Sequence, residues 1–304
     1  MSPEWFGGLS VAALAAWVYA RHAERWWVEV TRRDLPIARL PHSLSGLTIA
    51  HLTDLHHGRF GPLRYIRRAV ERTNALAPDV VALTGDFVDY RPEEVEPVAR
   101  ELGRLRAPLG VWAVLGGHDV RASERLFRRY FAEEGIRLLR NEAAPLPVEG
   151  QAVWIAGVRD NSEYFQHRLS QALAGVPRHA AVILLAHSPD IAWQAAERGV
   201  QLVLSGHTHG GQVCVPLFGP VVTESRYGRR FARGLTRAGE TWIYTSRGVG
   251  VVRLPVRFFA RPEIALHRLV SAPSPADGAV DESRHLVAGR HPEEDGCAAG
   301  GTRH

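Results

Sequence analysis

The sequence predicts an α/β domain with buried sheets, and three observations indicate this class. Short apolar runs alternate with segments of helical periodicity over residues 44–270. The apolar runs are nearly continuous, as in strands that are covered on both faces. Aspartate, histidine and glycine residues directly follow these runs. Because ligands bind beyond the carboxyl ends of the strands in such sheets, these polar residues are expected to form the functional site.

The expected elements follow one another along the chain. The run LTIAHLT at 47–53 predicts a strand that ends at Asp54. Residues 62–77 predict an amphipathic helix with Leu63 and Ile66 on its apolar face. The same patterns predict a helix at 93–106 and strands at 79–84, 111–115, 181–186 and 201–205.

Residues 1–25 predict a single N-terminal membrane anchor. The run 5–20 carries no charge, and its length falls just under the roughly 17–25 residues of a spanning helix. Arginines follow the run, at 21, 25, 32 and 33, so a segment inserted in the cell inner membrane is expected to leave the following domain on the cytoplasmic side. An amphipathic or buried N-terminal helix is the alternative interpretation.

The other boundaries rest on composition. Residues 26–43 are interpreted as a linker and residues 44–270 as the folded domain. Residues 271–304 are rich in Ser, Pro, Gly and Ala and carry six acids against three arginines, a net charge of −3. Such a segment buries too little apolar surface to offset its ordering entropy, so a disordered tail is expected.

The overall composition excludes several classes of protein. With 304 residues, 45% hydrophobic and 23% charged, the chain is neither disordered, collagen-like nor polytopic in the membrane. All 37 basic residues are arginine, which is compatible with phosphate-rich or anionic-lipid partners, but a biased codon composition is the preferred explanation. The two cysteines, Cys214 and Cys297, are too few for a disulfide framework or a thiolate zinc site.

Carboxylates and imidazoles at the expected strand ends predict a metal site. In Asp54-x-His56, alternate residues of an extended stretch point to the same side, so both side chains can reach one ion. The complete set of expected ligands is Asp54, His56, Asp86, His187, His207 and His209. Carboxylate and imidazole without thiolate suit Mn, Fe, Zn, Co or Ni.

These motifs, in their order, resemble the calcineurin-like metallophosphoesterases. The matching motifs are Asp54-x-His56, Gly85-Asp86-x-x-Asp89, Gly116-Gly117-His118-Asp119, His187 and Gly206-His207-Thr208-His209. Segments 206–212, 227–234 and 246–266 are similar to the bacterial membrane-associated phosphodiesterases of this superfamily, some of which are UDP-2,3-diacylglucosamine hydrolases of lipid A synthesis. The resemblance implies a four-layer α-β-β-α sandwich with its metal site at the C-terminal ends of the strands.

The resemblance also implies a metal-dependent phosphoric ester hydrolase with two divalent ions, Mn, Fe or Zn. Asp54, His56, Asp86 and His209 would hold the first ion, and Asp86, His187 and His207 the second. A hydroxide that bridges the ions would attack a phosphodiester or pyrophosphate. The catalytic residues would be His118, on the phosphate or the leaving oxygen, and Asp119, which would orient its ring.

One position departs from the family pattern. The family has asparagine, a ligand of the second metal, where this chain has Gly117. The second site is therefore expected to be weaker. The alternative function is a catalytically weakened metal-binding module that binds phosphorylated lipid or a partner protein. His118 has a chemical role in the family, so its presence favours the enzyme.

The expected partners follow from the same branch of the family. The substrate is expected to be a phosphorylated small molecule or a lipid-linked compound at a membrane surface, with UDP-2,3-diacylglucosamine as the leading candidate. No nucleic acid is expected as a partner.

Overall fold

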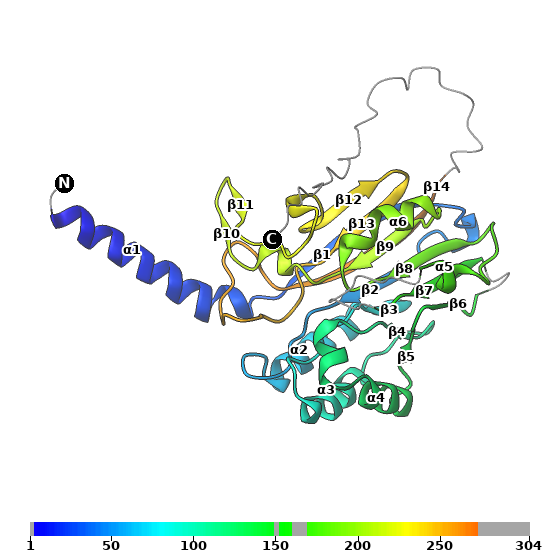
Figure 1. Cartoon of the computed structure of the whole chain (residues 1–304), viewed down its shortest axis with the longest axis horizontal. Coiled ribbons are helices and arrows are strands. Elements are labelled where there is room, and N and C mark those ends of the chain that lie inside the picture. The colour runs from blue at the N-terminus through cyan, green and yellow to red at the C-terminus, as the bar shows by residue number, and fades with distance from the viewer. Residues whose placement is uncertain (1–2, 149–151, 160–168, 273–304) are drawn as a thin grey trace, which may run out of the picture. The chain divides into compact units, whose positions relative to one another are not determined.

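The computed structural model describes residues 3–148, 152–159 and 169–272. Within them, two six-stranded sheets pack against each other, and helices cover the outer face of each sheet (Figure 1). This confirms the predicted α-β-β-α sandwich.

The first sheet contains the first and the last strand of the described residues. Its strands, in spatial order, are β1 (Glu29–Ala38), β14 (Glu263–Ala272), β2 (Thr48–Leu52), β3 (Val80–Leu83), β4 (Val111–Ala113) and β5 (Arg137–Leu138). Only the β14–β2 pair is antiparallel. The carboxyl ends of β2, β3 and β4 therefore lie at one edge of the sheet.

The second sheet is parallel at its centre and antiparallel at both margins. Its strands, in spatial order, are β12 (Gly234–Ala238), β13 (Thr241–Thr245), β9 (Leu202–Ser205), β8 (Ala181–Leu185), β7 (Val153–Gly157) and β6 (Glu142–Pro145). The β12–β13 and β7–β6 pairs are antiparallel. A separate hairpin is formed by β10 (Cys214–Val215) and β11 (Gly219–Pro220).

The helices complete the outer layers. Those against the first sheet are α2 (Leu63–Asn74), α3 (Val95–Leu102) and α4 (Gly117–Glu133), and those against the second are α5 (Leu169–Leu173) and α6 (Ala192–Glu197). Short 3₁₀ helices lie at Glu24–Trp26, His42–Leu44, Pro92–Glu94, Pro189–Ile191, His209–Gly211 and Gly228–Phe231.

Three apolar cores separate the four layers, and this explains the continuous apolar strands. In β2, Ile49 faces the core between the sheets, whereas Ala50 faces the core under α2–α4. In β8, Ile183 faces the core between the sheets, whereas Leu184 faces the core under α5 and α6. Both faces of each central strand are buried, so alternate residues cannot be polar.

The N-terminal segment forms helix α1 (Pro3–His22), but it is not the expected anchor. No helix in the described part of the chain is both long and apolar enough to cross a membrane. The apolar run at 5–20 contains five alanines, two glycines and a serine, which contribute little transfer free energy. The prediction of a single N-terminal anchor over 1–25, with an inner-membrane location and a cytoplasmic catalytic domain, is therefore wrong.

The end of α1 is joined to the domain. The carbonyl of Ala20 accepts a hydrogen bond from the Arg257 amide at 3.1 Å, and the Tyr19 and Phe258 rings lie 6.5 Å apart.

The structure differs from the expected linker at 26–43. β1 occupies most of this range and pairs with β14 over its whole length. Leu35 and Ile37 are fully buried, but the charged residues of Arg32–Asp34 before them hide the strand pattern. The first sheet ends at Ala272, and the tail expected at 271–304 lies outside the described residues from 273 onward.

Candidate metal centre

The expected metal ligands follow strands of both sheets. The hydrogen bonding of β2 and β3 continues past the strands, from Asp54 N to Gly85 O at 2.9 Å and from His56 N to Asp86 O at 3.0 Å. These bonds hold the two loops side by side. His187 follows β8, and its carbonyl accepts from Gly206 N at 2.9 Å, so the loops after β8 and β9 are paired in the same way.

Two glycines permit the close approach of these loops. At Gly85, φ is +90° and a Cβ would lie 2.3 Å from Gly116 N. At Gly206, a Cβ would lie 2.2 Å from the Asp54 carboxylate. Any side chain at either position would push the ligand-bearing loops apart.

The expected ligands adopt an unusual backbone conformation. Five of the six have positive φ, namely Asp54 (52°), His56 (46°), Asp86 (53°), His207 (71°) and His209 (52°). This left-handed region costs non-glycine residues about 1–3 kcal/mol and is concentrated at functional sites. The turns direct the side chains toward one another beyond the ends of the strands.

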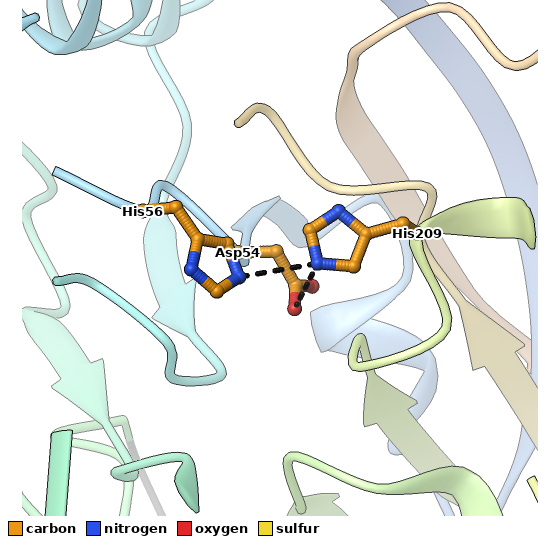
Figure 2. Close-up of side chains that lie close together, drawn as sticks. All are labelled: Asp54, His56 and His209. Atoms are coloured by element: carbon orange, nitrogen blue, oxygen red, sulfur yellow. Dashed lines mark hydrogen bonds and ion pairs between the residues drawn. The ribbon is translucent and has the colours of Figure 1, made fainter. Parts of the chain in front are cut away.

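A first group consists of Asp54, His56 and His209 (Figure 2). Their ligand atoms lie within 4.8 Å of one another, and all three residues are buried. His56 Nε2 lies 3.1 Å from His209 Nε2, which lies 3.5 Å from Asp54 Oδ1. Two nitrogens at about 2.1 Å from one ion are at most about 4.2 Å apart, so these imidazoles fit a shared divalent cation.

A second group consists of Asp86, His187 and His207, again with ligand atoms within 4.8 Å. His187 Nε2 lies 3.1 Å from Asp86 Oδ2. His187 Nδ1 donates to the Thr84 carbonyl at 2.7 Å, so Nε2 carries the lone pair on the side of the group.

Asp86 lies between the two groups. Its Oδ2 is 3.8 Å from His56 Nε2 and 3.1 Å from His187 Nε2. Its Oδ1 accepts from the His118 backbone amide at 3.0 Å, at the start of α4. One carboxylate thus faces an imidazole of each group.

Ionisation of these side chains suits cation binding. Burial opposes the charge on Asp86, but His187 and His56 hold the pKa of its carboxyl well below the usual range. Burial, followed by the charge of His56, lowers the pKa of His209 well below its ordinary value. An ionised carboxylate and neutral imidazoles are the forms that bind metal.

His56 is braced by Asp89. Its Nδ1 donates to Asp89 Oδ1 at 3.2 Å, which leaves Nε2 for the first group. Burial lowers the pKa of His56, but the hydrogen bond to Asp89 and the charge of Asp86 raise it overall. Asp89 also forms, with His56 and His118, a third set of possible ligand atoms within 4.8 Å of one another.

His118 lies beside both groups. Its Nε2 is 4.0 Å from Asp86 Oδ2, and its Nδ1 donates to the Asp89 carbonyl at 2.6 Å. The ring stacks on Tyr90 at 4.3 Å between centroids, and the Tyr90 hydroxyl lies 3.4 Å from Nε2. Burial lowers the pKa of His118, although the charge of Asp86 opposes this.

Asp119 differs from the expectation that it orients the His118 ring, because its carboxylate accepts from backbone amides. Oδ2 accepts from Gly116 N at 3.0 Å, and Oδ1 accepts from Phe87 N at 2.7 Å. Burial, with the charge of Asp86, raises the pKa of Asp119 to about 7. Asp119 therefore fixes the loop after Asp86 to the start of α4, and the Asp89 carbonyl holds the His118 ring.

Sequence reasoning missed two residues of the site, Tyr90 and Arg257. The Arg257 guanidinium is fully buried, and it donates to the carbonyls of Gly250 at 2.6 Å and Arg247 at 2.7 Å. Its Nη2 also lies 3.5 Å from His209 Nδ1. Neither residue belongs to a ligand pattern, so only the fold reveals them.

Comparison with known proteins identifies the family. Residues 47–211 match the calcineurin-like phosphoesterase family, and the chain belongs to it. The chain is 33% identical over 279 residues to the metallophosphoesterase YkuE of Bacillus subtilis, covering 88% of this chain and 95% of YkuE.

Two further relatives have more specific names. Phosphodiesterase YaeI of Escherichia coli is 29% identical over 265 residues, and UDP-2,3-diacylglucosamine pyrophosphatase LpxG of Chlamydia trachomatis is 27% identical over 320 residues. Each alignment covers 86% of this chain and 95% of the relative. The protein is a metallophosphoesterase, a metal-dependent hydrolase of phosphoric esters.

Proposed function

We propose that this protein hydrolyses phosphodiesters or pyrophosphates with two divalent cations. The observation that carries the proposal is the presence of two carboxylate–imidazole groups, with the Asp86 carboxylate close to an imidazole of each. Asp54, His56, His209 and Asp86 would hold the first cation. Asp86, His187 and His207 would hold the second. The donor set suits Mn, Fe or Zn.

When bound, two such cations neutralise charge on phosphoryl oxygens and lower the pKa of a bound water. The chain's own residues position the reaction. The Asp89 carbonyl fixes Nδ1 of His118 as a donor, so Nε2 of the protonated ring points its proton toward the Asp86 side of the site. There it can donate to the phosphate or to the leaving oxygen.

The proposed substrate is a phosphorylated small molecule or a lipid-linked compound. The names of YaeI and LpxG support a phosphodiester or a pyrophosphate. UDP-2,3-diacylglucosamine, a precursor in lipid A synthesis, is the leading individual candidate. Its test is release of UMP by the metal-loaded protein, and absence of UMP would remove this candidate alone.

The test of the reaction class uses bis(p-nitrophenyl) phosphate. Protein stripped by a chelator should be inactive, and added Mn²⁺ should restore release of p-nitrophenol. A protein that binds Mn²⁺ but turns over neither this diester nor a nucleoside diphosphate sugar would contradict the proposal. It would favour a module that binds metal without catalysis.

A further inference from the structure

Two cavities lie beside the metal centre, and Val252 and Arg253 line both. One has a volume of about 710 Å³, and its lining includes the charged residues Arg59, Asp89, Arg91 and Glu93. The other has a volume of about 360 Å³ and is an apolar groove. The lining of this apolar groove includes His207, His209, Val213, Val221, Val222, Val252 and Leu254.

The apolar groove begins at the candidate ligands themselves. His207 and His209 line it together with Val213, Val221 and Val222, which flank the β10–β11 hairpin in the sequence. An ester arm of a phosphoester bound at the two ligand groups would therefore be adjacent to this groove.

The walls of the groove are exposed apolar side chains. Val221 is 64% exposed, Val222 56% and Leu254 59%. Scattered apolar residues are ordinary on a protein surface, whereas a contiguous set beside a site marks a binding surface. The charged residues at the rim, Arg253 and Glu224, form an ion pair with each other. Apart from this pair and His207, Thr208, His209 and Gln212, the lining consists of aliphatic residues and Gly211.

The two walls are held in place by Gln212. Its side-chain Nε2 donates to the carbonyls of Val252 and Leu254, each at 3.0 Å. Its Oε1 accepts from the Val252 amide at 2.9 Å. These bonds tie the strip at 252–254 to the segment that leads into the hairpin, so the groove is formed before any ligand binds.

We propose that the apolar groove binds an aliphatic chain of the substrate while the phosphoryl group lies at the metal centre. The inference rests on the proposed function and narrows its substrate to amphiphilic phosphoesters. The groove lining contains no Phe, Tyr or Trp on which a nucleobase could stack, and its two histidines are the candidate metal ligands.

The test is the affinity of the full chain, loaded with Mn²⁺, for ethyl, butyl, hexyl and octyl phosphate, measured by isothermal titration. Complete burial of a methylene raises affinity about fourfold, from about 0.8 kcal/mol at about 1.4 kcal/mol per factor of ten. Because the groove is open on one side, we expect about a twofold gain per methylene.

Two variants near the β10–β11 hairpin test whether the dependence of affinity on chain length comes from the groove. Val222→Asp places a charge in the groove and should abolish the dependence on chain length. Val215→Asp is the matched control, because Val215 is 44% exposed on β10 and does not line the groove. This control should bind octyl phosphate as the parent does.

The outcomes separate this inference from the proposed function. Equal affinity for all four phosphates, in protein that hydrolyses bis(p-nitrophenyl) phosphate, would overturn the groove assignment alone. Chain-length dependence without any hydrolysis would support the groove and contradict the enzyme. An equal loss in Val215→Asp and Val222→Asp would show that the chain does not lie in the groove.

Discussion

The two ligand groups differ in how completely their residues are supported. In the first group, the Asp54 carboxylate accepts from the His207 amide at 3.0 Å, and Asp89 orients His56. The second group relies on Asp86, which it shares, and has Gly117 at the start of α4 where the family pattern has asparagine. We therefore expect the two cations of the proposed mechanism to bind with separable affinities, the first more tightly than the second.

The largest effect is expected from Asp86→Ala, because one carboxylate serves both groups. Activity on bis(p-nitrophenyl) phosphate should fall to background, and metal analysis should show loss of both ions. The matched control is Asp34→Ala, since Asp34 is an exposed carboxylate on β1 that pairs with Arg268 on β14. If Asp86→Ala keeps half its metal and rate, the shared assignment is wrong.

His118→Ala should lower the rate by about 10²–10⁴, the range for a positioned acid, with both metals retained. Metal content and rate should be measured on the same sample, because this separates a catalytic role of His118 from a role as a metal ligand. Loss of one metal would instead make His118 a ligand.

Gly117→Asn tests the weaker group directly. Gly117 is buried at the first position of α4 and is not among the described glycines with positive φ, so an asparagine meets no left-handed strain. Residues that only hydrogen-bond to metal ligands change metal affinity by about 10–100-fold. A new ligand should have a larger effect, so the variant should bind the second metal more than about 100-fold tighter than the parent does. Isothermal titration measures this. Two tight metals in the parent, unchanged in the variant, would show that another group completes the site.

The smallest effect is expected from Asp89→Asn, which removes the charge that braces His56. Affinity for the first metal should fall by about 10–100-fold, while the second group keeps its ligands. An equal loss at both groups would mean that Asp89 supports the loops in general rather than His56.

The central strands and the candidate metal ligands could be predicted from the sequence, because hydrophobic periodicity specifies the strands and residue type specifies the ligands. The central strands are apolar on both faces, and the ligands follow them directly, so strands and candidate ligands were predicted together. β1 was missed because its buried residues, Leu35 and Ile37, follow three charged ones. The anchor was wrong because an uncharged run of small residues is not hydrophobic enough to cross a membrane. The positions of Tyr90 and Arg257 depend on loops that meet only in the folded chain.

The left-handed turns at five of the candidate ligands make cation binding part of the folding equilibrium. Their conformational cost exists whenever the chain is folded, but the gain from the ions exists only when they are bound. By linkage, free metal at 100 times its dissociation constant adds about 2.7 kcal/mol to the free energy of unfolding. The temperature at which this protein unfolds should therefore rise with free metal concentration, so a calorimeter can report the occupancy of the centre without any substrate.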